Sequence, residues 1–286
     1  MMTAHENSKL DPVIAQFKHE MFLLCTGIAN VANEIGQALP AWGPDITQPV
    51  NARFSFAETN AARLPDELAL AVLQVAGAHV HTIGRFMQDE FTPPATVAPI
   101  ARSAVENAAL LIFLTRDESP EFRTVRAARA IRAGMNRDKA HKLKGLEDLY
   151  DNLNKLVTRY TTKNEIPDLK HDKVEYTELV ELTLGELVGD EFYGELCSYT
   201  HHNTWKAFYQ FIAANENPTV LEVDSLYFAQ KMALALAGAA FSILKYREPT
   251  QTANLQELLN DKTTRLLRLG EEIQGYLEAL ASNRSD

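Results

Sequence analysis

Apolar residues recur every three or four positions along most of this chain, and that spacing restricts the fold to packed helices. The clearest example lies near the start of the chain: Val13, Phe17, Met21, Leu24, Ile28, Val31 and Ile35. Residues at this spacing share one side of an α-helix. No segment has the apolar–polar alternation, or the Val-, Ile- and Thr-rich runs, that are typical of β-strands. The sequence therefore predicts an all-α fold.

The helical patterns and the breaks between them predict a single multi-helix domain of about seven or eight helices. With 286 residues the chain is long enough to bury one large core. We expect residues 1–9 to be disordered, 10–250 to form the helical core domain, and 251–286 to form a long C-terminal helix.

Two helices in this scheme, 96–116 and 190–214, are expected to cross at the centre of the domain. The stretch 40–63 is rich in proline and has no sustained period. A segment of this length is a functional loop, a lid or a strap that caps the core. We expect a strap, because Trp42, Phe54 and Phe56 need burial.

The C-terminal helix, expected over 254–280, carries a leucine-rich seam with charged residues on its other sides. The seam is Leu255, Leu258, Leu259, Leu266, Leu269, Ile273, Tyr276 and Leu280. Such a seam packs on the body of its own chain or pairs with a second copy. We expect a homo-oligomer that forms through this helix.

Composition indicates a cytoplasmic protein. The formal net charge of −10 disfavours general affinity for nucleic acid or for an anionic membrane. The longest apolar run, Met232 to Leu244, has 13 residues and falls short of the roughly 20 that cross a bilayer. The polar N-terminus differs from a secretory signal, and two isolated cysteines, Cys25 and Cys197, indicate a reducing compartment.

One basic segment departs from this acidic average. Between Arg116 and Lys144 there are nine Lys/Arg against four Asp/Glu, and four arginines repeat every three residues: Arg123, Arg126, Arg129 and Arg132. Two interpretations of this stripe are open. In the functional alternative it binds a polyanion such as RNA. In the structural alternative it pairs with Glu175, Glu178 and Glu181, which repeat at the same interval. We favour the structural alternative and keep nucleic acid as a possible partner.

The richest stretch in functional groups is 190–211, DEFYGELCSYTHHNTWKAFYQF. If it is one helix, Tyr193, Cys197, His201, Thr204 and Phe208 share one line, and Ser198, His202, Trp205 and Tyr209 share the next. A histidine in such a setting is either a general acid–base group or a structural residue. His201 is the candidate catalytic residue, and His202 and Trp205 are candidate ligand-binding residues.

A second candidate pair, Arg102 and Glu106, lies four residues apart in the alanine-rich segment ARSAVENAALLIFL. It is either an ion pair on the helix surface or an internal pair that holds a third polar group. His79 and His81 lie two apart on the helix that precedes it, so they point in different directions and are expected to be structural.

Standard catalytic signatures are absent from the sequence: there is no HExxH, no Walker loop, no GxGxxG and no GxSxG. The Glu-x-x-His pair of di-iron bundles is absent as well. We therefore predict no metal site and no cofactor.

Two motifs carry a family resemblance that covers roughly residues 65–215. ARSAVENAALLIFL, followed by Glu121, Phe122, Arg123 and Arg126, resembles an R-x-x-x-E pattern with an Arg-rich helix after it. FYGELCSYTHHN resembles a Y-x-x-L-S-x-x-x-H pattern, with Cys197 in place of the serine. Together they resemble DUF5677, a group of uncharacterised bacterial helical proteins, and more distantly HEPN-like bundles.

The resemblance picks out Arg102, Glu106, Tyr193, Leu196 and His201. HEPN ribonucleases are expected to carry an arginine followed by four to six residues and a histidine. No histidine of this chain has an arginine at that spacing. The chain thus departs from the nuclease pattern.

Two functional hypotheses follow. The first is a cytosolic helical binding protein, self-associating, in which Arg102, Glu106, Tyr193 and His201 form one polar cluster that is structural or holds a ligand. The second is a HEPN-like RNA- or nucleotide-processing enzyme of a bacterial toxin or phage-defence type. In that enzyme His201 is the acid–base group, Arg102 binds phosphate, and Arg123 and Arg126 attract the polyanion.

Overall fold

The structure, a computed structural model, describes residues 11–38, 59–116, 120–162, 175–201, 203–246 and 252–282. These residues confirm the all-α prediction, and no strand occurs among them. They form ten α-helices rather than the seven or eight expected: α1 (Pro12–Ala38), α3 (Thr59–Phe86), α4 (Pro94–Leu114), α5 (Pro120–Arg137), α6 (Glu147–Thr162), α7 (Tyr176–Val188), α8 (Asp190–Thr200), α9 (Thr204–Glu216), α10 (Pro218–Tyr246) and α11 (Ala253–Ser282). A short 3₁₀ turn, η2 (Ala140–Lys142), links α5 to α6.

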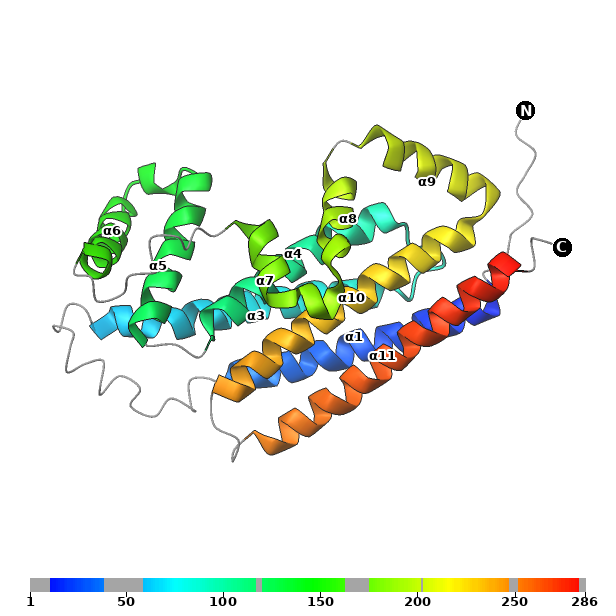
Figure 1. Cartoon of the computed structure of the whole chain (residues 1–286), viewed down its shortest axis with the longest axis horizontal. Helices are drawn as coiled ribbons and strands as arrows, with labels where there is room; N and C mark the ends of the chain where they lie inside the picture. The colour runs from blue at the N-terminus through cyan, green and yellow to red at the C-terminus, as the bar shows by residue number, and fades with distance from the viewer. Residues whose placement is uncertain are drawn as a thin grey trace.

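Long helices form the body of the molecule, with α1 and α11 along one side and α3, α4 and α10 beside them (Figure 1). The most extensive pairing joins α10 to α4, and α1 also packs on α3 and α10. Apolar side chains line these contacts because α4 and α10 are apolar around most of their circumference, as helices at the centre of a protein are. The predicted crossing partner of α4, the segment 190–214, contacts it mainly through α8.

A second, smaller apolar core lies between α5 and α6, at one end of the molecule (Figure 1). It consists of Val125, Ala128, Met135, Leu153, Leu156 and Val157. α5 ends at Arg137, where the backbone turns through Lys139 in the left-handed region, and α6 folds back against it.

The leucine seam of α11 packs on the body of its own chain. Leu259 and Leu266 are completely buried and Leu269 is nearly so, and α11 contacts α1 and α10. The expected helix, 254–280, thus begins one residue earlier and ends two residues later than predicted. Oligomerisation through this helix stays a prediction, with most of the seam already occupied inside one chain.

Proline does not stop two of the helices. α3 begins at Thr59 and contains Pro65, so the expected strap loses its last five residues to that helix. α10 begins at Pro218, and proline fits this first helical position because its missing N–H has no partner to lose there. The predicted disordered segment 1–9 and the residues 40–58 of the strap lie outside the described residues.

Two glycines allow close approaches or turns that other residues would strain. Gly189 has φ of 92° and separates α7 from α8. Gly238 faces α7 so closely that a Cβ there would lie 2.8 Å from Cδ2 of Leu187. These two positions set how α7 and α8 lie against α4 and α10.

A buried ion pair joins α1 to the first turns of α10. Nζ of Lys18 lies 2.8 Å from Oε2 of Glu222, and the two side chains are 2% and 1% exposed. Lys18 also donates to the carbonyl of Asp89 (2.8 Å), and the backbone N–H of Thr92 donates to Oε1 of Glu222 (2.9 Å). The pair thus holds in place the segment that connects α3 to α4. The candidate site described below lies on α4.

α4 and α10 are both long and apolar enough to span a membrane by length and composition. However, 61% and 67% of their apolar windows are buried inside the protein, and core helices of soluble proteins pass the same test. Two such helices are weak evidence, so the cytoplasmic location stays a prediction.

Candidate functional site

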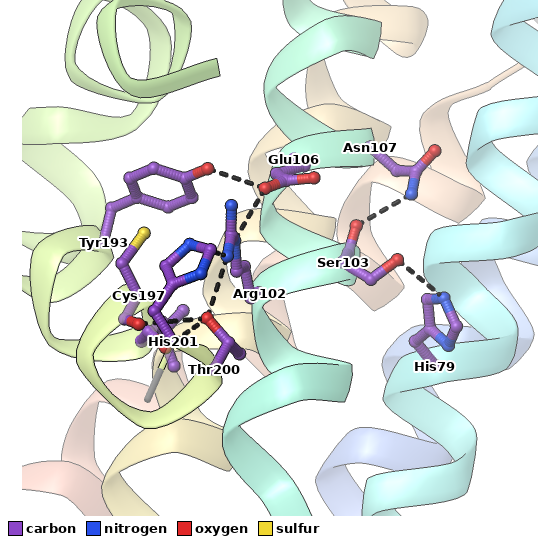
Figure 2. A network of polar contacts seen from close by, with 10 residues as sticks. His79, Arg102, Ser103, Glu106, Asn107, Tyr193, Cys197, Thr200 and His201 are labelled. Atoms are coloured by element: carbon purple, nitrogen blue, oxygen red, sulfur yellow. Dashed lines mark hydrogen bonds and ion pairs between the residues drawn. The ribbon is translucent and has the colours of Figure 1, made fainter. Parts of the chain in front are cut away.

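One side of α4 is polar although most of the helix is buried. Arg102, Ser103, Glu106 and Asn107 lie at spacings of one, four and five residues, so they share this side. All four are half-buried, between α3 on one flank and α8 on the other (Figure 2). The segment from Pro94 to Leu114 thus presents a polar face between two neighbouring helices.

The inner part of the site joins α4 to α8 through one carboxylate. Oε1 of Glu106 accepts hydrogen bonds from Nε of Arg102 (2.9 Å) and from the hydroxyl of Tyr193 (2.6 Å). Burial, together with the neighbouring Glu106, raises the pKa of Tyr193 well above its usual range, so the phenol stays protonated and donates. The Arg102 guanidinium lies 5.7 Å from the centre of the Tyr193 ring. Such charge-assisted hydrogen bonds are about twice as strong as neutral ones.

The outer part of the site lies at the C-terminus of α8. Nη1 of Arg102 donates to Oγ1 of Thr200 (2.8 Å) and lies 3.0 Å from Nε2 of His201. Because a guanidinium only donates, Nε2 of His201 is the acceptor in this contact. His201 is exposed, whereas Tyr193 is 4% exposed. The site therefore runs from a buried phenol to an imidazole in contact with solvent.

These contacts confirm that Arg102, Glu106, Tyr193 and His201 form one polar cluster, as the sequence predicted. Residues 98 and 99 positions apart in the chain become neighbours of one guanidinium. The sequence left open whether Arg102 and Glu106 form a surface pair or an internal pair. They are 25% and 21% exposed and hold third groups, so the internal alternative holds.

A second imidazole lies on the other flank of the same polar face. Nε2 of His79, on α3, lies 3.0 Å from Oγ of Ser103, and Asn107 donates to the carbonyl of Ser103 (2.7 Å) (Figure 2). Burial lowers the pKa of His79, so its ring is neutral near pH 7. This partner supports the prediction that His79 is structural. The exposed His81 points elsewhere.

The predicted helix 190–214 is two helices, because α8 ends at Thr200 and α9 begins at Thr204, and this corrects the expected arrangement of its side chains. Asn203 caps a new helix, because its Oδ1 accepts from the backbone N–H groups of Trp205 and Lys206. Trp205 is consequently 65% exposed on α9 instead of lining the cluster. His202 lies outside the described residues.

The arginine stripe of α5 is mostly buried rather than laid out on a surface. Arg123 and Arg126 are 8% and 5% exposed. The Arg126 guanidinium lies 4.3 Å from the centre of the Phe113 ring, a cation–π contact. Arg132 donates to Oδ1 of Asn154 on α6 (3.0 Å). Ligand binding by Arg123 and Arg126 stays a prediction that their burial disfavours.

The structural alternative for this stripe is pairing with Glu175, Glu178 and Glu181. All three glutamates are exposed, and α5 packs mainly on α3 and α6. Pairing between the arginines and these glutamates stays a prediction.

Sequence reasoning missed a second polar cluster, where α8, α9 and α10 meet. The Tyr199 hydroxyl lies 3.5 Å from Oδ2 of Asp224, and Tyr209 lies near the same carboxylate. Burial, with Glu195 nearby, raises the pKa of Asp224 to about 6. Nζ of Lys206 lies 3.3 Å from Oε1 of Glu195. The available signal was Asp224 itself, a carboxylate near the start of an otherwise apolar helix.

No metal site was predicted, and within the described ranges no group of three or more His, Cys, Asp or Glu side chains is placed to hold a metal ion. The cluster around Arg102 offers hydrogen-bond donors, one carboxylate and one accessible imidazole. Such a set suits the binding of an anionic group or the transfer of a proton.

Comparison with known proteins adds no assignment, because no family model, no curated protein and no solved structure matches this chain.

Proposed function

We propose that this chain is a helical ligand-binding protein and that the cluster around Arg102 and His201 binds a phosphate-bearing ligand. The observation that carries the proposal is the 3.0 Å contact between Nη1 of Arg102 and Nε2 of His201, at the exposed end of the cluster. An arginine and a histidine that meet beside solvent offer a phosphate several donors from one direction.

The inner half of the cluster holds the guanidinium in place. Glu106 binds Nε of Arg102, and Tyr193 in turn binds Glu106. Among the described residues, the hydrogen bonds of Arg102 use Nε and Nη1 and leave Nη2 for a ligand. An arginine fixed in this way loses less conformational freedom when it binds.

The imidazole of His201 can take part in either protonation state. A neutral ring accepts from Nη1 of Arg102, and a protonated ring donates to a phosphate oxygen and adds a positive charge. We therefore expect His201→Ala to weaken phosphate binding.

The proposal is tested by calorimetric titration of the full-length chain with inorganic phosphate, a nucleoside monophosphate and the matching uncharged nucleoside. We expect both phosphates to bind, and Arg102→Met to weaken binding by roughly tenfold or more. Arg268→Met is the matched control: Arg268 makes the same i, i+4 contact with Glu272 (3.0 Å) but is 79% exposed on α11. Equal binding by wild type and Arg102→Met, or equal binding of nucleoside and monophosphate, contradicts the proposal.

A second candidate is the RNA- or nucleotide-processing enzyme, as in the HEPN-like resemblance. The arrangement that favours it is the pair of imidazoles, His79 and His201, on the two flanks of one polar face. In acid–base catalysis one group accepts a proton and another donates one, and two imidazoles on one face can share these two roles. Incubation with mixed RNA tests it: cleavage by wild type that His201→Ala abolishes supports the enzyme, and intact RNA with wild type removes it.

A further inference from the structure

The outward side of α9 carries three aromatic side chains that the protein leaves in solvent. Trp205, Phe208 and Phe211 are 65%, 54% and 69% exposed and follow one another at intervals of three residues. The rings of Trp205 and Phe208 contact each other, with centroids 6.3 Å apart. A group of neighbouring exposed aromatic residues is unusual on a monomeric protein and marks an interaction surface.

The opposite side of α9 contacts neighbouring helices, and these contacts hold α9 with its three aromatic side chains toward solvent. Lys206 pairs with Glu195 of α8 (3.3 Å) and lies 4.7 Å from the centre of the Tyr199 ring. Tyr209 lies near Asp224 of α10. Contacts on that side to two helices orient α9, which stands at the edge of the molecule beside α8 and the start of α10 (Figure 1).

The charge of this surface decides which partner it fits. Within α9 only Lys206 and Glu216 are charged, and Lys206 is engaged by Glu195. A polyanion or an anionic membrane binds through cations, and α9 offers none on this side. A second copy presents the same uncharged aromatic side, and two such sides meet without charge repulsion.

The exposed area of the three aromatic rings sets the affinity that we expect for this contact. Three rings that each expose more than half of their surface offer on the order of 300–400 Å² per copy. A stable interface buries about 800 Å² per partner. Neighbouring side chains of α8 and α9 must supply the rest, so the association is expected to be reversible and micromolar.

We propose that two copies of this chain associate by packing α9 against α9 around a twofold axis, with Trp205, Phe208 and Phe211 at the centre. In such a contact each residue meets the same surface of the partner copy. This inference is independent of the phosphate site and differs from association through α11, in which Leu259 and Leu266 are already buried.

Sedimentation velocity of the full-length chain, from about 1 to about 100 µM, tests this self-association. Wild type is expected to pass from monomer to dimer over this range. Phe208→Glu and Phe211→Glu should weaken the dimer at least about tenfold, because each places like charges at the twofold axis. Matched controls are Leu182→Glu on α7 and Leu267→Glu on α11, which are 59% and 48% exposed and should leave the dimer intact.

A second measurement uses the fluorescence of Trp205 in a Trp42→Phe variant, since the chain has two tryptophans. A blue shift with rising protein concentration is expected, and Phe211→Glu should remove it. A chain that stays monomeric throughout overturns the proposal, and so does a dimer that Leu267→Glu abolishes while Phe208→Glu does not. Monomeric wild type that instead binds anionic lipid vesicles or single-stranded RNA through Phe208 overturns it as well.

Discussion

Two polar clusters in this protein use the same kinds of charged group in opposite ways. The pair of Lys18 and Glu222 is 2% and 1% exposed, and its hydrogen bonds all go to other parts of the chain. The cluster of Arg102 and Glu106 is 25% and 21% exposed and ends at His201, which is in contact with solvent. The first cluster is closed, and the second is open at one end.

This difference separates a structural role from a functional one. Taking charges out of water costs several kcal/mol, and a buried pair is kept only when each partner stays satisfied. The Lys18 pair therefore fixes helices α1 and α10 and the connection before α4. The Arg102 cluster is accessible to a ligand at its outer end, because its outermost group, the imidazole of His201, is exposed to solvent.

The largest expected effect on stability comes from a substitution in the closed cluster of Lys18 and Glu222. Lys18→Met leaves the carboxylate of Glu222 buried without its cation and should lower the free energy of unfolding by about 3–5 kcal/mol. Urea denaturation measures it. The double variant Lys18→Met with Glu222→Gln removes both charges and keeps an acceptor for Thr92, so it should recover much of the loss. A double variant no more stable than Lys18→Met would show that the charge of Glu222 is not the cause.

The next effect depends on pH and concerns Asp224. Its pKa is raised to about 6 from the usual 3.8, chiefly by burial, so the folded state holds this proton more tightly than the unfolded state. The stability from that proton is complete below about pH 4 and is lost as the pH rises through about 6, up to roughly 3 kcal/mol. Asp224→Asn keeps an acceptor for the tyrosines and should remove this loss.

Urea denaturation of wild type and Asp224→Asn between pH 4 and 7 tests this dependence. The difference between the two proteins should grow in favour of Asp224→Asn as the pH rises. A constant difference would mean that Asp224 is ionised throughout and that its burial is less costly than inferred.

A smaller loss is expected at the inner end of the open cluster. Tyr193→Phe removes the hydrogen bond to the Glu106 carboxylate and should lower the free energy of unfolding by about 1.5–2 kcal/mol. Tyr150→Phe is the control, because no described residue accepts from the Tyr150 hydroxyl; it should change stability by less than about 0.5 kcal/mol. Equal effects of the two substitutions would remove the special role of Tyr193.

The smallest effect on stability is expected at the outer end. His201→Ala changes an exposed residue and should shift the free energy of unfolding by less than about 0.5 kcal/mol, yet weaken phosphate binding by roughly tenfold. A loss of phosphate binding with little loss of stability is the opposite of what we expect for Lys18→Met, which acts on stability. A large loss of stability together with unchanged binding would place His201 among the structural residues.

Much of the candidate site could be predicted from the sequence. The interval between Arg102 and Glu106 places them on one side of a helix, and FYGELCSYTHHN gathers Tyr193 and His201 in another. Their meeting was correctly predicted, whereas their roles remain predictions. The second cluster was missed because its members come from three helices, and no local pattern links Glu195 or Lys206 to Asp224.

The break after His201 shows where local pattern is misleading. Helical spacing continues through 190–211, so the sequence predicted one helix and placed Trp205 beside the cluster. The Asn203 side chain caps a new helix instead, and the direction of the chain changes. A cap residue competes with helix continuation, and which of the two forms depends on the packing of both segments.

The sequence by itself determined the helical fold, because the spacing of apolar residues is a local property that each segment carries alone. Only the tertiary structure decided which charges are buried, which are paired and which meet solvent. The contact of Lys18 with Glu222 joins residues 204 positions apart, and the arginine stripe packs on partners that no interval along the chain indicates. Such contacts depend on how whole helices pack, and this is why the open and the closed cluster could be told apart only in the folded molecule.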